Sequence, residues 1–224
     1  MNSAIIGSVA LKVMLNRCRS TWAPNNLNIA TPHNGLQVFS TILWSLGYQL
    51  NNMGIKRNEA TSTLTHSEYI NLDNKIITIT EVKELDSFLS IILRSNHTTS
   101  MNFITSNLCC ALYPVQSLKE QATYAYWYPP GPVDTSKIEL RNFAVIMNSI
   151  NHPINPALCC LNVQHQFTNH SGVGLFEWNP HPSRENILLR SYTWQLGDIC
   201  LHRSCRIKRI SHLLVRRNSR TTES

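Results

Sequence analysis

One aromatic stretch that ends in prolines most constrains how this chain can fold. Residues 124–132 read Tyr-Ala-Tyr-Trp-Tyr-Pro-Pro-Gly-Pro, so four aromatic side chains fall within five positions before three prolines and a glycine. Aromatic residues favour a half-buried, pleated surface, and proline cannot donate a ladder hydrogen bond. The stretch therefore predicts a strand over 124–128 that ends at Pro129.

Hydrophobic periodicity extends this expectation along the chain. Strands are predicted in a hairpin over 64–80 that turns at Asp73-Asn74, and over 138–150, 161–167, 172–178 and 188–194. Helices are predicted over 36–50 and 81–94, after Pro114, and in the C-terminal segment that carries Ile207, Ile210 and Leu214. The expected fold is mostly β with some α: an antiparallel, jelly-roll-like β-sandwich with two or three helices, or alternatively an α+β fold.

Charge divides the sequence into three parts. The net charge is +7, and no Asp or Glu precedes Glu59 or lies between Asp198 and Glu223. We expect an acid-free arm or helical segment over 1–58, a β-rich domain over 59–198, and a basic tail over 199–224. The cations of the tail are Arg203, Arg206, Lys208, Arg209, Arg216, Arg217 and Arg220. Such a cluster binds phosphate groups with little regard to base sequence, so these seven residues are the predicted nucleic-acid contacts.

The first 22 residues allow two interpretations. They carry Lys12, Arg17 and Arg19 among apolar residues and contain no acid. That pattern is typical of a mitochondrial presequence, and it also fits a basic N-terminal arm. No run approaches the length of apolar residues that a membrane-spanning helix needs.

The seven cysteines do not predict a disulfide framework. Their number is odd, and four of them form the adjacent pairs Cys109-Cys110 and Cys159-Cys160. Adjacent residues of a strand point to opposite faces, so one cysteine of each pair is expected in the core. The best zinc-like spacing, Cys200-x-His202-x-x-Cys205, lacks a clean second pair of ligands. We therefore expect neither a metal nor another cofactor.

Motifs typical of enzymes are absent from the sequence. It contains no Gly-rich phosphate loop, no G-x-S-x-G elbow and no H-E-x-x-H pair. Its carboxylates number thirteen, and most fall in predicted solvated helix turns. The sequence predicts a non-enzymatic protein.

Two short segments resemble the capsid proteins of small icosahedral viruses. Tyr124–Gly131 resembles a strand end of picorna-like jelly-roll capsids, and Thr65-His66-Ser67-Glu68-Tyr69-Ile70 is similar to the first strand of plant-virus shell domains. The resemblance implies an eight-stranded, two-sheet jelly roll that self-assembles into a shell and holds RNA on basic arms.

These observations lead to three functional hypotheses. The first is a structural viral protein of the capsid class, a homo-oligomer whose expected nucleic-acid partner is RNA rather than DNA and which resides in the virion or host cytoplasm. The second is an imported mitochondrial protein of a ribosomal or inner-membrane assembly. The third is a small viral RNA-binding accessory protein.

Overall fold

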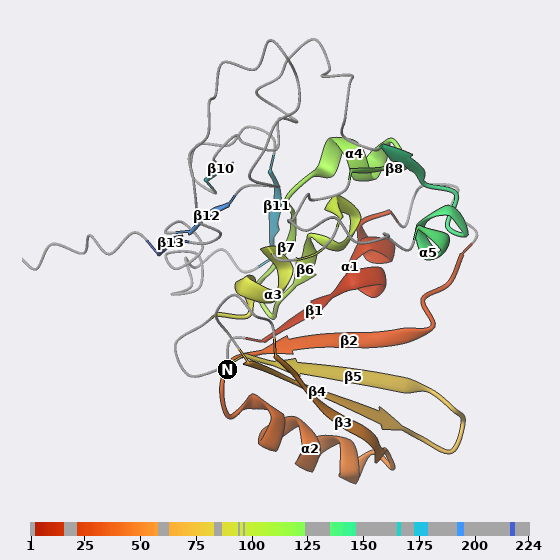
Figure 1. Cartoon of the computed structure of the whole chain (residues 1–224), viewed down its shortest axis with the longest axis vertical. Coiled ribbons are helices and arrows are strands. Elements are labelled where there is room, and N and C mark those ends of the chain that lie inside the picture. The colour runs from red at the N-terminus through yellow and green to blue at the C-terminus, as the bar shows by residue number, and fades with distance from the viewer. Residues whose placement is uncertain are drawn as a thin grey trace, which may run out of the picture.

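The described part of the chain is organised around one eight-stranded sheet. A computed structural model describes residues 3–15, 22–57, 63–82, 87–93, 95, 97–123, 135–146, 165–166, 173–178, 192–194 and 216–217. The strand order of the sheet is β11-β7-β6-β1-β2-β5-β4-β3 (Figure 1). Its strands are β1 (Ala4–Ile6), β2 (Asn26–Thr31), β3 (Gln49–Arg57), β4 (Thr63–Ile70), β5 (Ile76–Glu81), β6 (Asn102–Ile104), β7 (Leu108–Ala111) and β11 (Gly174–Glu177). Neighbouring strands are antiparallel except β2 and β5, which are parallel.

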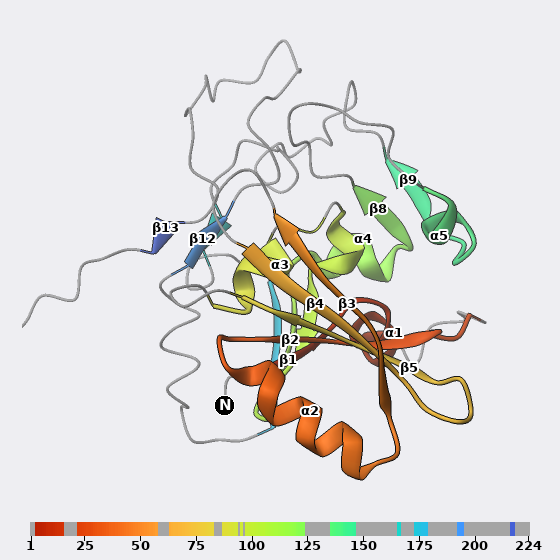
Figure 2. The same cartoon turned by 60° about the horizontal axis from the view of Figure 1, so that its bottom comes forward.

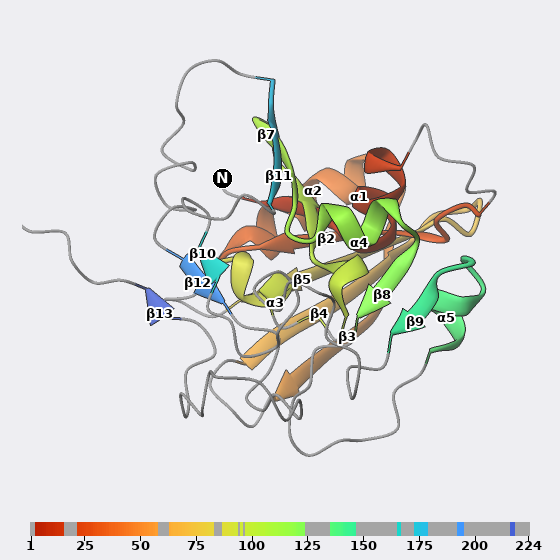
Figure 3. The ribbon, with the colours of Figure 1, turned by 90° about the horizontal axis from the view of Figure 1, so that it is seen from above.

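Helices and two smaller sheets complete the described structure. The helices are α1 (Gly7–Met14), α2 (Gly35–Ser45), α3 (Leu89–Leu93), α4 (Pro114–Leu118), α5 (Ser136–Glu139) and the 3-10 helix η1 (Thr98–Ser100). A parallel pair joins β8 (Gln121–Thr123) to β9 (Ala144–Ile146), and a three-stranded sheet joins β10 (His165–Gln166), β12 (Tyr192–Trp194) and β13 (Arg216–Arg217). The pair and the three-stranded sheet lie on opposite sides of the molecule (Figure 3).

The expected fold class is confirmed: the described residues are mostly β with some helix. The jelly roll is not confirmed. The main sheet is mixed, because β2 and β5 run parallel, whereas the expected sandwich was antiparallel throughout. The chain reaches β5 from β2 through α2 and the β3–β4 hairpin, and a parallel pair requires a long connection of this kind.

The N-terminal residues form the centre of the sheet rather than an arm. β1 pairs with both β2 and β6, and Leu11 of α1 is buried. Gly7 makes the turn from β1 into α1 at a φ of +69°, where a Cβ would lie 3.1 Å from the side-chain nitrogen of Asn28. Among the apolar residues read as an amphipathic arm or presequence, Leu11 and Leu15 are core residues, whereas Val13 is exposed. The strands that 1–58 contributes, β1, β2 and β3, belong to the same sheet as β4 and β5.

The predicted hairpin over 64–80 is confirmed. β4 and β5 are antiparallel, and the side chain of Asn71 accepts hydrogen bonds from the backbone N–H groups of Asp73 and Lys75 at the turn. On the polar face, His66 shares a hydrogen bond with Thr80, and Glu68 accepts one from the amide of Asn51. These side chains act as cross-strand partners.

Helix α2 covers the opposite, apolar face of the hairpin (Figure 2). Leu43 packs there with Ile29, Tyr69, Ile77 and Ile79. The helix is shorter than the predicted 36–50, because the chain turns at Gly47 with a φ of +80° and Leu50 already belongs to β3. Its N-terminus is capped from a distant strand: Glu81 of β5 accepts a 3.0 Å hydrogen bond from the backbone N–H of Leu36.

Two further predictions are corrected. Among the described residues of the predicted helix over 81–94, α3 alone is helical, and Glu81 is the last residue of β5, where it pairs with Thr31 and Thr65. The predicted strand over 138–150 begins with α5 and a turn at Asn142, so only Ala144–Ile146 is a strand among its described residues. In both cases the local pattern, helical over 81–94 and period-two over 138–150, runs past the end of the real element. Pairing with distant strands sets where each element begins or ends.

Four other predicted elements are confirmed where they are described, whereas Arg216 and Arg217, the described residues of the predicted helical C-terminal segment, form the strand β13. The helix after Pro114 is α4, and β10, β11 and β12 fall within the strands expected at 161–167, 172–178 and 188–194. The aromatic strand over 124–128, its proline turn, and most of the C-terminal segment lie outside the described residues.

The adjacent cysteines behave as the strand pattern predicts. Cys110 is fully buried among Phe103, Leu108 and Leu112, whereas Cys109 is half-buried on the other face of β7. Both are free thiols, and burial raises the pKa of each. Neither is activated as a nucleophile, because only the thiolate form is reactive.

Candidate nucleic-acid interface

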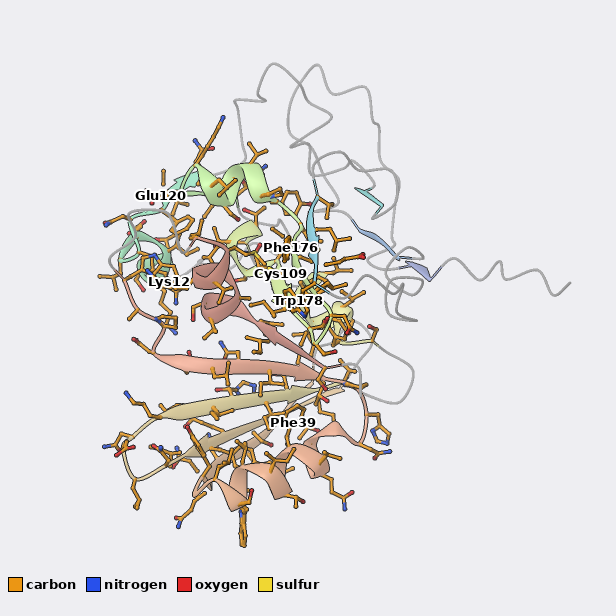
Figure 4. The ribbon with its side chains drawn as sticks, turned by 180° about the vertical axis from the view of Figure 1, so that it is seen from behind. Lys12, Phe39, Cys109, Glu120, Phe176 and Trp178 are labelled. Atoms are coloured by element: carbon orange, nitrogen blue, oxygen red, sulfur yellow. The ribbon has the colours of Figure 1, made fainter. Side chains whose placement is uncertain are left out.

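Two aromatic side chains stand exposed at β11, an edge strand of the main sheet: Phe176 lies in the strand, and Trp178 directly follows its last residue. Phe176 is 67% exposed and Trp178 is 46% exposed. Their ring centroids lie 6.2 Å apart and their planes are tilted by 47°. Figure 4 shows both rings beside Cys109, which is paired with Phe176 in the β11–β7 register. Alternate residues of a strand share a face, so the two rings form one surface.

Backbone contacts hold this surface in place. The indole Nε1–H of Trp178 donates to the carbonyl of Ser106, and its backbone N–H donates to the carbonyl of Asn107 at 3.1 Å. On the same face, two residues before Phe176, Gly174 lies so close to α4 that a Cβ would be 3.2 Å from Pro114. The indole is therefore oriented before any ligand binds, which lowers the entropic cost of binding.

An exposed aromatic pair of this kind suits the recognition of unpaired bases. Every base presents a π-face, and stacking on an aromatic side chain is tolerant of base sequence. Single exposed apolar residues are common on protein surfaces, but clustered ones often mark an interaction site. The apolar pattern of 172–178 predicts the strand but not its binding potential. The signal was available in Phe176-Glu177-Trp178, where both aromatics occupy the same face.

The three-stranded sheet holds two predicted phosphate contacts, Arg216 and Arg217, and it places Arg217 next to an aromatic position. Arg217 lies opposite Tyr192, and His165 lies opposite Trp194. Directly opposite residues of an antiparallel pair share a face, so the register places positions 165, 192, 194 and 217 on one face. The basic tail contains no aromatic residue of its own. The pairing of β13 with β12 places aromatic positions of β12 beside the tail. This three-stranded sheet lies on the same side of the molecule as β11 (Figure 1).

The other predicted site residues are not described. Five of the seven tail cations lie outside the described residues: Arg203, Arg206, Lys208, Arg209 and Arg220. The zinc-like set Cys200, His202 and Cys205 lies outside them too. Within the described ranges, no group of three or more histidine, cysteine or acidic residues could hold a metal ion. No helix in those ranges is long and apolar enough to cross a membrane.

A second aromatic and cationic cluster has a structural role. Lys12 Nζ lies 5.2 Å, and the guanidinium carbon of Arg141 5.1 Å, from the ring centroid of Trp22. Trp22 packs against the core formed by Leu11, Leu15, Ala122, Ile138 and Phe143. The cation–π contacts tie α1 to the turn after α5. Since this ring is partly buried and already has cationic neighbours, it is not a stacking surface.

His97 is neutral at physiological pH. Burial, and secondarily the charge of Arg141, lower its pKa to about 4. Its Nδ1 shares a 2.7 Å hydrogen bond with the hydroxyl of Thr99, and its Nε2 a 3.2 Å bond with that of Ser100. An imidazole that is uncharged near pH 7 adds nothing to phosphate attraction. Its role is to order η1.

We expect His97 to make stability depend on pH. Its pKa is about 4 in the folded protein against 6.5 in a model peptide, so the unfolded state binds more protons between these values. The free energy of unfolding should therefore fall as the pH is lowered from 6.5 to 4, by roughly 3 kcal/mol at most. Urea unfolding across this range measures the fall, and replacing His97 by Asn should remove this component. An NMR titration giving a pKa near 6.5 for His97 would contradict the prediction.

Comparisons with known proteins do not place the chain in a family. No family model matches it, and no curated protein matches it. Among solved structures, the apo form of a CCA-adding enzyme matches 46% of this chain and 22% of its own chain, with 14% identity and a TM-score of 0.31. At that TM-score the likeness supports no conclusion about fold or activity.

Proposed function

We propose that this protein is a non-enzymatic binder of single-stranded nucleic acid, with RNA as the expected partner. The observation that supports the proposal is the exposed, pre-oriented Phe176–Trp178 pair on the sheet edge. Unpaired bases would stack on the two rings, and the cations of the basic tail would contact the phosphates. Single-stranded RNA exposes its bases for such stacking, whereas an RNA duplex hides them.

Stacking and charge make separable contributions to binding. The affinity that cationic contacts supply weakens as the salt concentration rises. A plot of log affinity against log salt concentration has a slope of about −0.7 for each phosphate contacted on a single strand. Aromatic stacking adds about 1–3 kcal/mol per base and is much less sensitive to salt. Each contribution can be removed while the other is kept.

The double variant Phe176→Leu/Trp178→Leu tests stacking. Leucine keeps apolar bulk on β11 but removes the π-face, so affinity for a fluorescein-labelled oligouridine should fall by about 10-fold or more. The salt slope should not change. Leu72→Ala is the matched control, because Leu72 is 96% exposed on the β4–β5 turn and lies away from the interface. Unchanged affinity in the leucine variant, or equal wild-type affinity for duplex RNA, would refute the proposal.

The double variant Arg216→Ala/Arg217→Ala tests the phosphate contacts. If each arginine meets one phosphate, the log–log salt slope should decrease in magnitude by about 1.4. Lys75→Ala with Lys137→Ala removes two cations from other parts of the fold and is the control for net charge. An identical salt slope in the wild type and the arginine variant would show that β13 does not contact the phosphates.

The narrower hypotheses stay predictions. A coat protein should form particles visible by negative-stain electron microscopy. An imported mitochondrial protein should lose about 20 N-terminal residues in cells. A zinc-dependent accessory protein should unfold when EDTA removes the metal from Cys200, His202 and Cys205.

A further inference from the structure

The two exposed rings at β11 lie side by side rather than face to face. Phe176 and Trp178 are two positions apart, and two residues of a strand span about 6.5 Å. Their ring centroids are accordingly 6.2 Å apart, with the ring planes tilted by 47°. A base held between two rings would need them parallel and on opposite sides of it. This pair instead offers two separate stacking surfaces, each of which can take one base.

The distance between the two rings is fixed by the backbone. Trp178 donates hydrogen bonds from its indole and its backbone N–H to the carbonyls of Ser106 and Asn107. The β6–β7 turn that supplies these carbonyls is itself held, because the Thr105 hydroxyl accepts a 3.2 Å hydrogen bond from the backbone N–H of Asn107. Pairing with β7 holds the backbone of Phe176. Rotation of its side chain therefore cannot bring the two rings to the separation of stacked bases.

The positions beside the rings carry small, uncharged side chains. Cys109 of β7 lies opposite Phe176, and Ala111 lies opposite Gly174. Gly174 is the position before Phe176 on this face. It has no side chain, and Pro114 of α4 lies 3.2 Å from where a Cβ would be. β11 therefore offers two rings, and a preference among bases has to come from the stacking of the ligand itself.

We propose, building on the function proposed above, that the ring pair binds two consecutive bases that are not stacked on each other. The ligand is then an unstacked, pyrimidine-rich single strand. Neighbouring bases of a stacked strand are parallel and about 3.4 Å apart, whereas bases on the two rings would be about twice as far apart and tilted. Binding must therefore open the stack between them. Oligouridine, whose one-ring bases stack weakly, should bind more tightly than oligoadenylate.

Fluorescence anisotropy with labelled oligonucleotides of equal length tests this preference. Oligouridine and oligoadenylate carry the same phosphates, so the basic tail should bind both alike. The wild type should bind oligouridine about 3- to 10-fold more tightly, the upper figure being the cost of breaking one base step. Warming should shrink the ratio, because adenine stacks in the free strand melt. Equal affinity, or tighter binding of oligoadenylate, would overturn the proposal.

The double variant Phe176→Leu/Trp178→Leu shows whether the preference comes from the rings. Without them no base step has to open, so the ratio of the two affinities should fall to about 1, as expected of phosphate contacts alone. Leu72→Ala, an exposed change on the β4–β5 turn, should keep the wild-type ratio. A double variant that also keeps the wild-type ratio would overturn the proposal.

Strands with abasic positions count the bases that are bound. In an otherwise abasic strand of fixed length, two adjacent uracils should bind the wild type about 5-fold or more tightly than one uracil, because the second ring is then filled. In Phe176→Leu the second uracil should add much less. No gain from the second uracil in the wild type, or the same gain in Phe176→Leu, would overturn the proposal.

These outcomes separate the stacking proposal from the requirement for unstacked bases. If the double leucine variant binds oligouridine as tightly as the wild type does, the proposed function itself is wrong. If that variant loses affinity for both oligonucleotides equally, the rings stack on bases but do not require an open step.

Discussion

Replacing Phe103 by alanine is expected to lower the free energy of unfolding by about 3–5 kcal/mol. Phe103 is fully buried in β6, and its ring meets that of Phe88 edge-to-face at a centroid distance of 5.6 Å. The strand lies between β1 and β7, where Phe103 pairs with Ile6 and Cys110. Removing the ring would leave a cavity where β1 joins the rest of the sheet. Because β6 has a paired strand on each side, the surrounding residues could not move in to fill that cavity.

Urea unfolding of matched variants can check this value. Phe103→Leu keeps most of the volume and should cost less than half as much as alanine. Phe176→Ala removes the same ring from an exposed position of β11, and surface substitutions usually change stability by no more than about 0.5 kcal/mol. A loss below about 1 kcal/mol for Phe103→Ala would mean that the core around β6 is not packed as described.

Replacing Gly35 by alanine is expected to destabilise the protein, although alanine is the better helix former. Helix propensity alone predicts a gain of up to about 1 kcal/mol. A Cβ at Gly35, however, would lie 1.8 Å from the Thr31 hydroxyl and 2.8 Å from both the Cβ and Cγ2 of Thr31. Thr31 is completely buried at the end of β2, so it cannot move aside. We expect a net loss of about 1–3 kcal/mol, which is typical of overpacking.

A double-mutant cycle isolates this clash. Thr31→Ala removes the two side-chain atoms beyond Cβ, so the cost of Gly35→Ala should be smaller in that background. Gly54→Ala is the control, because a Cβ there meets nothing within 4 Å. An increase in stability for Gly35→Ala, or a cost that is the same in both backgrounds, would contradict the close contact between α2 and β2.

Of the two features expected to bind nucleic acid, the basic tail is evident from the sequence, whereas the Phe176–Trp178 surface is evident only from the structure. The basic tail is visible as a run of cations without acids. The stacking surface depends on the place of 174–178 at the edge of the main sheet, and that place is fixed by the pairing of β11 with β7, more than 60 residues earlier in the chain. The densest aromatic stretch of the sequence is 124–128, but the aromatic residues that support the proposal are Phe176 and Trp178.

Local patterns were sufficient where each element depends on its own residues. The β4–β5 hairpin follows from two β-branched runs around an Asn-rich turn, and burial of Cys110 but not Cys109 follows from the alternation of a strand. The apolar spacing of Leu36, Phe39 and Leu43 similarly predicts the buried side of α2. In these cases side-chain periodicity and turn chemistry act over a few residues, so the sequence by itself determined the result.

Only the tertiary structure decided where these elements meet. Residues 4–6 become a central strand because β2 and β6 satisfy their backbone hydrogen bonds, although their composition equally suits an arm. The carboxylate of Glu81 caps α2, and Thr31 requires glycine at position 35, across separations that no local pattern encodes. Hydrogen bonds and close packing between distant segments select one arrangement from several that periodicity allows.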